Sequence, residues 1–463
     1  MLPSRWWFLG LFCLVTFSLG SAETVQEKNL TEIMRTNYEE SQVPIYVLPN
    51  PLVCEDGTPV ASAEIWENRR RPELLKLLET QMFGEVPETL RGDHPPFVTF
   101  EVMEEDTEAL GGKAIRRQVA IHFAAPQPAP HKISATDPVR KSFDSLEHQP
   151  AGEISIPYET ALVLIYLPKK AERPVPCFLG MNFRGNQTIW NDPGIFPSEI
   201  FPDGKFPPEK ERGVAASRWN VEKILDAGYG LVTLYYQDIV PDRKDCFQAG
   251  LFSLYGSPSR TRESWGAISA WAWALSRVMD YIEQDSDLDS CRVALMGHSR
   301  LGKTALWAGA CDPRFAIVIS NNSGCGGAAL SRREYGERVI RINHTFPHWF
   351  CLNFHAYGEE VSKLPFDQHE LIALMAPRPV YITSAEEDRW ADPKGEYLSA
   401  WNAVPVYRLL GTDAFGEGRS ADLPPLNQSV GATIGYHIRN GKHDVTDFDW
   451  EQFIRFANRH FQR

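Results

Sequence analysis

An alternation of short apolar runs with helix-like segments, from residue 161 onward, restricts the possible folds more than any other feature. Helical patterns separate several runs of strand length, which begin at Ala161, Val175, Gly230, Val293, Phe315 and Pro379. Strands that are buried on both faces have continuous apolar sequences, because helices cover each side of a parallel sheet. The alternation therefore predicts an α/β protein with a mostly parallel central sheet.

The part of the chain before residue 156 has a different pattern. Residues 71–83 have helical spacing, and residues 97–123 alternate apolar with polar side chains, which predicts an antiparallel hairpin. We predict an N-terminal extension, residues 23–155, packed on a catalytic domain formed by residues 156–463. The length of 463 residues is compatible with one large α/β domain and this extension.

Residues 1–22 are typical of a secretory signal peptide. Arg5 precedes an apolar stretch over residues 6–19, and the small residue Ala22 is followed by a polar one. This stretch is shorter than the roughly 20 residues that a membrane span needs, although an uncleaved anchor is the alternative. We expect cleavage after Ala22, a secreted or periplasmic protein, and no membrane attachment after cleavage.

Composition excludes several classes of partner. Asp and Glu outnumber Lys and Arg by 60 to 47, so the chain has no general attraction to nucleic acid or to anionic membranes. No zinc-type cysteine or histidine spacing and no nucleotide-binding glycine motif occurs in the sequence, and we predict neither a metal nor a cofactor. Removal of the signal leaves seven of the eight cysteines, so at least one thiol is free. We expect a monomer.

The sharpest motif is Gly297-His-Ser299-Arg-Leu-Gly302, which lies between a predicted strand and a predicted helix. A strand that turns through Gly-x-Ser into a helix is a nucleophile elbow, in which the serine hydroxyl stands at the end of the sheet. The N–H groups of the following helix favour an oxyanion at the same place. The motif predicts an α/β-hydrolase three-layer sandwich with Ser299 as nucleophile; a strand-end serine without function is the alternative.

A serine nucleophile needs a base and an acid that orients the base, and in this fold they follow in the order Ser, acid, His. His443 lies just before the last predicted helix and is the expected base, whereas His437 is more typical of a packing histidine. The loop after the late strand at 379–385 supplies four candidate acids, which are Glu386, Glu387, Asp388 and Asp392.

Two cations stand beside the nucleophile of an otherwise acidic chain. The Arg300 N–H should face the oxyanion, and its guanidinium could stabilise the developing charge. Together with Lys303 it indicates a substrate that bears carboxyl-type oxygens; ordinary helix-surface charges are the alternative. Trp265, Trp271 and Trp273 fit a core helix, whereas Trp390 lies in the acid loop, where an aromatic face suits a sugar ring.

Four segments resemble the bacterial glucuronoyl esterases of carbohydrate esterase family fifteen, and they are residues 297–303, 320–333, 390–396 and 442–444. That family cleaves esters between 4-O-methyl-glucuronic acid on xylan and lignin alcohols. The resemblance implies a glucuronoxylan or lignin-carbohydrate ester as substrate. It also implies roles for six residues, with Ser299 as nucleophile, His443 as base, Arg300 at the oxyanion, and Lys303, Glu337 and Trp390 as substrate contacts.

The chain departs from the family at one position. Many members place the triad acid just before a Ser-Gly-x-Gly-Gly segment, where this chain has Asn322. An amide cannot balance an imidazolium, so the resemblance moves the acid role to Asp388. The alternatives to a glucuronoyl esterase are an acetyl xylan esterase or other carbohydrate deacetylase on the same fold, and a binding module that has lost catalysis.

Overall fold

The computed structural model describes residues 31, 33–124, 160–198, 211–256, 260–416 and 420–462. The predicted signal peptide and the predicted boundary between residues 155 and 156 lie outside these described residues. Residues 37–463 form one compact unit, and every element named below belongs to it. None of the described helices combines the length and the apolar character that a membrane-spanning helix requires.

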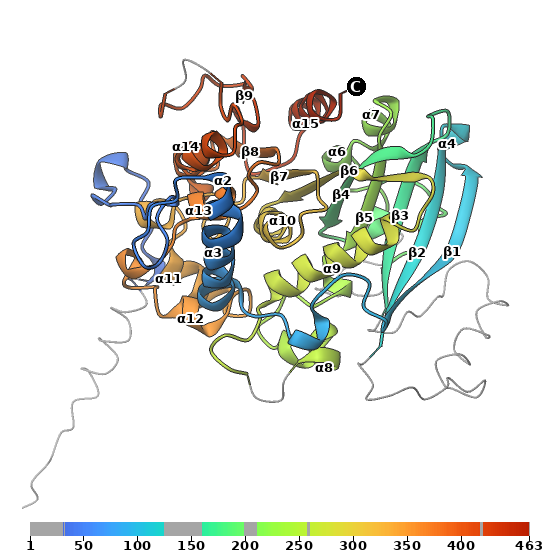
Figure 1. Cartoon of the computed structure of the whole chain (residues 1–463). Coiled ribbons are helices and arrows are strands. Elements are labelled where there is room, and N and C mark those ends of the chain that lie inside the picture. The colour runs from blue at the N-terminus through green and yellow to red at the C-terminus, as the bar shows by residue number, and fades with distance from the viewer. Residues whose placement is uncertain are drawn as a thin grey trace, which may run out of the picture. The chain divides into compact units, whose positions relative to one another are not determined.

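One ten-stranded sheet organises the unit, and its strand order is β1-β2-β3-β5-β4-β6-β7-β8-β10-β9 (Figure 1). The strands from β5 to β10 in this order pair in parallel, while β1, β2, β3 and the short β9 pair antiparallel with their neighbours. The bounds are β1 Val98–Glu108, β2 Ala114–Phe123, β3 Thr160–Pro168, β4 Val175–Asn182, β5 Gly230–Tyr235, β6 Leu288–His298, β7 Ile317–Asn321, β8 Val380–Ala385, β9 Val430–Gly431 and β10 Ile434–Arg439.

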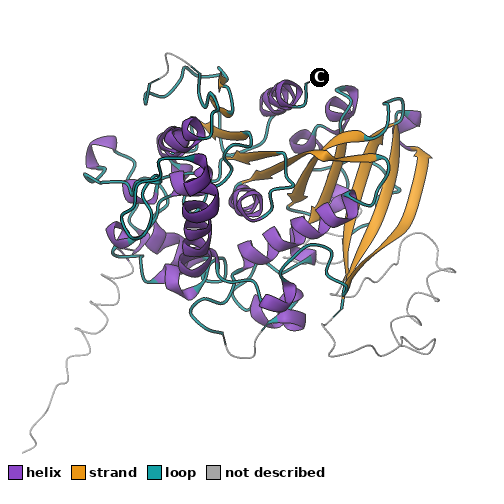
Figure 2. Ribbon diagram, viewed as in Figure 1, coloured by secondary structure: helices purple, strands orange, loops and turns teal. Residues whose placement is uncertain are grey.

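Helices cover both faces of the sheet (Figure 2). One face packs on α9 (Ala267–Ile282), α10 (Arg300–Cys311), α13 (Gln368–Ala373) and α14 (Pro393–Leu409). The other face packs on α6 (Ala216–Trp219), α7 (Val221–Asp226) and α15 (Asp447–His460). This is the predicted α/β architecture with a mostly parallel sheet between helical layers.

Shorter helices complete the unit. The N-terminal helical segment consists of α2 (Ala63–Ile65), a π-helical turn (Trp66–Arg70), α3 (Arg71–Leu78) and a second π-helical turn (Glu79–Phe83). In the described part of the chain, the other α-helices are α4 (Ala109–Gly112), α8 (Leu251–Tyr255), α11 (Val339–Thr345) and α12 (Leu352–His355). The 3₁₀ turns are η1 Glu40–Gln42, η4 Glu88–Leu90, η6 Asn186–Thr188, η8 Tyr236–Asp238, η9 Cys246–Gln248, η10 Ser331–Arg333, η11 Val361–Lys363 and η12 Arg389–Ala391.

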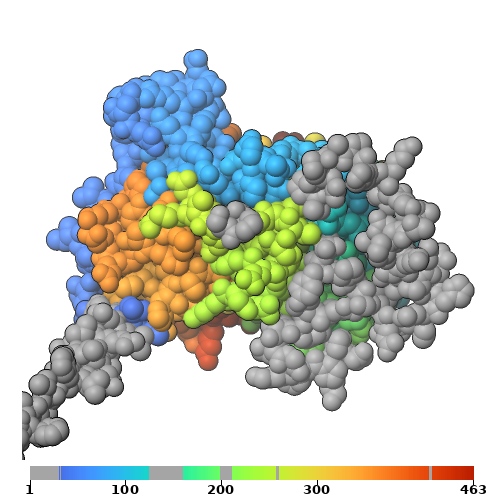
Figure 3. All heavy atoms as spheres, turned by 90° about the horizontal axis from the view of Figure 1, so that it is seen from below, coloured from blue at the N-terminus to red at the C-terminus, as the bar shows by residue number. Residues whose placement is uncertain are grey.

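The predicted hairpin before residue 124 is confirmed, since β1 and β2 pair antiparallel from Val98 and Phe123 onward. It is continuous with the main sheet, because β2 pairs with β3. The N-terminal helical segment packs on the opposite end of the unit, where Arg70 forms a buried ion pair with Glu370 of α13 at 3.0 Å. Figure 3 shows this part of the chain, in blue, against the orange segment.

The core explains the aromatic content of the chain. Trp271 is completely buried and Trp273 is nearly so, which confirms the prediction of a core helix for these two residues. Trp265 is also buried, but it precedes α9, which begins at Ala267. Helix α9 is buried along its whole length, and the Trp273 indole N–H donates to the Leu90 carbonyl of η4 at 2.9 Å. The seven cysteines among the described residues are all unpaired.

A buried ion network holds the loop between β10 and α15. Arg439 donates to the Asp449 carboxylate at 2.7 Å, and also to the carbonyls of Asn440 and Asp444 at 3.0 and 2.5 Å. Asp449 accepts a further bond from His437 at 2.8 Å. Arg439 binds the loop through two carbonyls, those of Asn440 and Asp444, and Asp449 balances the charge of Arg439. The network therefore fixes the backbone between Asn440 and Asp444.

We predict that Asp449→Ala destabilises the protein by about 3–5 kcal/mol, because it leaves the Arg439 charge buried without its carboxylate. Unfolding in urea measures this change. Asp447→Ala is the matched control, since Asp447 is exposed and pairs with Lys223 at the surface, and it should cost less than about 1 kcal/mol. Equal losses in the two variants would contradict the prediction.

Candidate active site

Ser299 occupies a strained turn between β6 and α10. Its φ and ψ angles are 56° and −127°, a backbone conformation that residues other than glycine rarely adopt and that recurs at functional sites. Gly297 makes the turn possible, because a Cβ atom there would lie 1.9 Å from the Leu301 carbonyl oxygen. Ser299 is also the N-cap of α10, and its own N–H donates to the Asn321 carbonyl at 2.9 Å. The chain therefore forms the predicted elbow.

Gly302, the last residue of the motif, has a packing role. A Cβ atom on Gly302 would lie 3.0 Å from the Cβ of Ser323 and 3.1 Å from the Gly297 carbonyl oxygen. Gly302 thus lets the first turn of α10 approach both the elbow and the loop that follows β7. Leu301, just before it, turns into the core and is buried.

His443 and Asp388 form a close pair. The Asp388 Oδ2 atom lies 2.6 Å from Nδ1 of His443. Asp388 lies in the loop after β8, and His443 lies in the loop after β10. Because β8 and β10 are parallel neighbours, their carboxyl ends bring these two loops together. With Nδ1 engaged by the carboxylate, Nε2 is the ring nitrogen left to act as a base.

The His443 ring also lies beside the nucleophile segment. Its centroid is 4.4 Å from that of His298, the residue before Ser299. The His298 side chain is buried and bonded to the Asn321 side chain at 2.6 Å. Burial, with the nearby His443 adding to it, lowers the pKa of His298 to about 3, so this ring is neutral and supports its neighbour by packing.

Asp388 is held by a second residue. Asn322, at the position where the family often has its acid, donates from Nδ2 to Asp388 Oδ2 at 2.9 Å. Burial acts to raise the pKa of Asp388, but the bonds from His443 and Asn322 outweigh it and the pKa is lowered. The departure at residue 322 therefore replaces a carboxylate with a donor that stabilises the carboxylate of Asp388.

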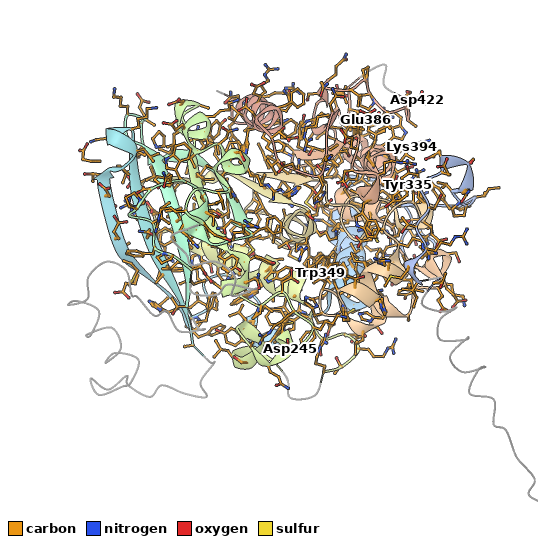
Figure 4. The ribbon with its side chains drawn as sticks, turned by 180° about the vertical axis from the view of Figure 1, so that it is seen from behind. Asp245, Tyr335, Trp349, Glu386, Lys394 and Asp422 are labelled. Atoms are coloured by element: carbon orange, nitrogen blue, oxygen red, sulfur yellow. The ribbon has the colours of Figure 1, made fainter. Side chains whose placement is uncertain are left out.

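Among the described residues, the other three candidate acids form no hydrogen bond or ion pair with His443. Glu386 and Glu387 are exposed, and Figure 4 shows Glu386 toward the outer edge of the molecule. Asp392 caps α14 by accepting from the Gly395 N–H at 3.0 Å and pairs with Arg333 at 2.8 Å. His437 is buried within β10 and contacts Asp449 and Tyr381, which agrees with the packing role expected for it.

The two cations beside Ser299 have different environments. Arg300 is partly exposed and pairs with Asp242, and its guanidinium lies 4.8 Å from the ring centroid of Trp349. Lys303 is buried and donates to the Ser323 carbonyl at 2.5 Å. Burial lowers the pKa of Lys303, although the nearby charge of Glu337 opposes that shift. Lys303 is therefore an interior charge and not a surface one.

Glu337 and Trp390 lie in adjoining segments. The Glu337 N–H donates to the Trp390 carbonyl at 2.9 Å, and the Arg341 guanidinium lies 5.6 Å from the centroid of the Trp390 ring. Burial raises the pKa of Glu337 against the attraction of Lys303, Arg300 and Arg341. The structure thus brings Lys303, Arg300 and Glu337 within electrostatic range of one another.

Glu396 is a buried carboxyl group that sequence reasoning did not identify. Its two oxygens accept from Ser384 Oγ at 2.6 Å and from the Gly324 N–H at 3.0 Å, so it ties β8 to the loop after β7. That loop also contains Asn322 and the Ser323 carbonyl bound by Lys303. Burial raises the pKa of Glu396 to about 8.

The fold, the elbow and the neighbouring acid–histidine pair together define the α/β-hydrolase class. A family model described as fungal glucuronyl esterase matches residues 211–411. Carbohydrate esterase MZ0003, from an unknown prokaryotic organism, is 48% identical over 436 residues, which cover 92% of each chain.

Two solved structures agree. A glucuronoyl esterase from Solibacter usitatus superposes with a TM-score of 0.79 at 44% identity, over 91% of this chain and all of that one. A marine metagenomic esterase of carbohydrate esterase family 15, described as promiscuous, gives 0.78 at 47% identity, over 92% of this chain and all of that one. The chain belongs to carbohydrate esterase family 15, the glucuronoyl esterases.

We predict that Asp388→Asn lowers kcat for ester hydrolysis by about 10³- to 10⁴-fold, because an amide cannot balance the imidazolium and favours the wrong tautomer. Steady-state kinetics on a simple ester measure the change. Glu387→Gln neutralises the exposed neighbour and should leave the rate unchanged. Near-normal turnover of Asp388→Asn would remove this residue from the triad.

A second prediction concerns pH. An unfolded Glu titrates near 4.5, so between about pH 4.5 and 8 the folded protein holds one proton more at Glu396 than the unfolded chain does. Stability must then fall as pH rises through this range. Glu396→Gln cannot ionise, so it should reduce this loss and be most stabilising, relative to the parent, near pH 8 and above. Thermal unfolding at pH 5 and pH 8 tests it; a pH-independent difference would refute it.

Proposed function

We propose that the protein hydrolyses esters of glucuronic acid or its 4-O-methyl derivative, which link xylan to lignin alcohols, through an acyl-enzyme on Ser299. The observation that carries the proposal is the Asp388–His443 pair at the same sheet edge as the Ser299 elbow and its two cations. Membership of a family named for this reaction supports the substrate class.

In the proposed mechanism, His443 takes the proton of the Ser299 hydroxyl as its oxygen attacks the ester carbonyl. The carbonyl oxygen becomes an oxyanion, which the Arg300 N–H, its guanidinium and the N-terminal end of α10 stabilise. His443 then returns the proton to the departing alcohol. His443 then deprotonates a water molecule, which attacks the acyl-enzyme carbonyl. The bond to Ser299 Oγ breaks, His443 returns the proton to this oxygen, and the glucuronate leaves.

Lys303, Glu337 and Trp390 are the proposed contacts of the sugar acid. A buried ammonium group can recognise carboxyl-type oxygens, and a buried carboxylate can accept from sugar hydroxyls. Trp390 supplies an aromatic face and an N–H donor. The electrostatic proximity of Lys303, Arg300 and Glu337 supports this assignment, since a small acetyl group would need no such set of charges.

The remaining features of the proposal concern the whole chain. A signal peptide over residues 1–22, cleaved after Ala22, would direct a monomeric enzyme to the periplasm or the exterior. Residues 23–155 form the extension and residues 156–463 the catalytic domain. The continuity of β2 with β3 supports a tight association between the two parts.

A second candidate function is carbohydrate deacetylation. One related enzyme of the same family is described as promiscuous, so a preference for glucuronoyl over acetyl esters needs a direct measurement. We predict that benzyl glucuronate is hydrolysed with a higher kcat/KM than acetylated xylose, and that Ser299→Ala abolishes both reactions. Lys303→Met should weaken the glucuronate reaction more than the acetyl reaction, because it removes the buried charge and keeps the volume.

Product release measured by chromatography tests this prediction, with Lys363→Met as the matched control, since Lys363 is exposed and pairs only with Glu360 among the described residues. Acetyl release without glucuronate cleavage would replace the first function by the second. Equal effects of Lys303→Met on the two substrates would remove Lys303 from the recognition of the acid.

A further inference from the structure

Asp242 is a carboxylate with four side-chain donors close to the nucleophile. Its Oδ1 atom accepts from His348 Nε2 and Trp349 Nε1, both at 2.7 Å. Its Oδ2 atom accepts from the Tyr236 hydroxyl at 2.9 Å and from Nη1 of Arg300. The donors come from η8, from the start of α10 and from the segment between α11 and α12, so one carboxylate joins three separate parts of the chain.

The Asp242 carboxylate is almost inaccessible to solvent, with 4% of its side chain exposed. Burial acts to raise its pKa, but the bond from His348, the charge of Arg300 and the bond from Trp349 outweigh burial and lower it. The lowered pKa favours the ionised form of Asp242. A buried charge of this kind persists because all its acceptor sites are used.

Arg300 needs such a partner. It is the first residue of α10, where the free N–H groups make the environment positive and disfavour a cation. Asp242 offsets this repulsion through the ion pair. Three aromatic rings limit the remaining freedom of the guanidinium, with Trp349, Phe346 and Phe183 at 4.8, 5.3 and 6.0 Å from it.

Trp349 takes part both in the hydrogen bonds of Asp242 and in the aromatic packing around Arg300. Its indole N–H binds Asp242, its ring lies under Arg300, and it stacks on Phe346 at 3.8 Å with an angle of 2° between the rings. Figure 4 shows Trp349 toward the middle of the molecule, in keeping with its burial. Loss of the carboxylate would therefore release both the charged end of Arg300 and the ring beside it.

We propose that Asp242 is a positioning residue: it holds the Arg300 guanidinium where the oxyanion forms at the Ser299 site. Asp242 acts on the reaction only through Arg300. The proposal rests on the proposed role of Arg300 and adds the residue that sets its position. Among the described residues, the side-chain bonds of Asp242 go to Tyr236, Arg300, His348 and Trp349, and none goes to Ser299 or His443, so its proposed contribution depends on the presence of the arginine.

The test is a double-mutant cycle with Asp242→Asn and Arg300→Ala. Asp242→Asn should lower kcat about 10- to 100-fold, less than the roughly 100- to 1,000-fold that removal of an oxyanion donor costs. If Asp242 acts through Arg300, adding Asp242→Asn to Arg300→Ala should lower kcat no further. Losses that multiply in the double variant would overturn the proposal, as would a normal kcat in Asp242→Asn.

Asp192→Asn is the matched control. Asp192 is also a buried aspartate, paired with Arg116 of β2 at 2.6 Å and bonded to the Tyr166 hydroxyl of β3 at 2.6 Å. Like Asp242, it is a buried carboxylate bound by an arginine and a tyrosine, but its partners belong to β2 and β3. The control should lose thermal stability as Asp242→Asn does, but keep its kcat per site, with sites counted by titration with a serine-reactive phosphonate.

Two additions keep the test decisive. Should Asp242→Asn fail to fold, Asp242→Glu retains the charge but displaces it, and the same cycle with Arg300→Ala applies.

All variants are also measured on p-nitrophenyl acetate. Cleavage of this ester but not of benzyl glucuronate by the parent would refute the proposed substrate, while the coupling between residues 242 and 300 would still decide the role of Asp242.

Discussion

The parallel pairing of β6, β7, β8 and β10 is the constraint on which the site depends. His298 at the end of β6 lies opposite Asn321 of β7, Asn321 lies opposite Thr383 of β8, and Ala385 of β8 lies opposite Arg439 of β10. Since parallel strands end at one edge, this register places the elbow, the acid loop and the histidine loop side by side. A shift of one residue in any pair would turn the strand's side chains to the other face and move the loop that follows.

Buried polar contacts then fix the direction of each reactive side chain. Asn322 holds Asp388, Asp449 holds Arg439 and with it the His443 loop, and Asp242 holds Arg300. Buried charges add little net stability, because desolvation costs about as much as the pairing returns. Their value here is geometric, since a mispaired alternative would leave a charge without a partner.

The sequence was sufficient to predict the fold class, the elbow at Ser299 and the pairing of His443 with an acid after the late strand. These depend on local signals, namely apolar periodicity, a glycine before the serine, and chain order. Asp242 could not be found this way, because it lies 58 residues from Arg300 and in a loop without a motif. Glu396 and Arg439 were not identified either, because the sequence does not distinguish a buried charged residue from an exposed one.

The acid loop has a consequence for how such an enzyme can change. Asp388 binds the histidine, Trp390 bonds through its carbonyl to Glu337, and Asp392 caps α14, all within five consecutive residues around η12. A substitution or insertion at 388–392 would therefore disturb the Asp388–His443 pair, the contact of Trp390 with Glu337 and the cap of α14 together.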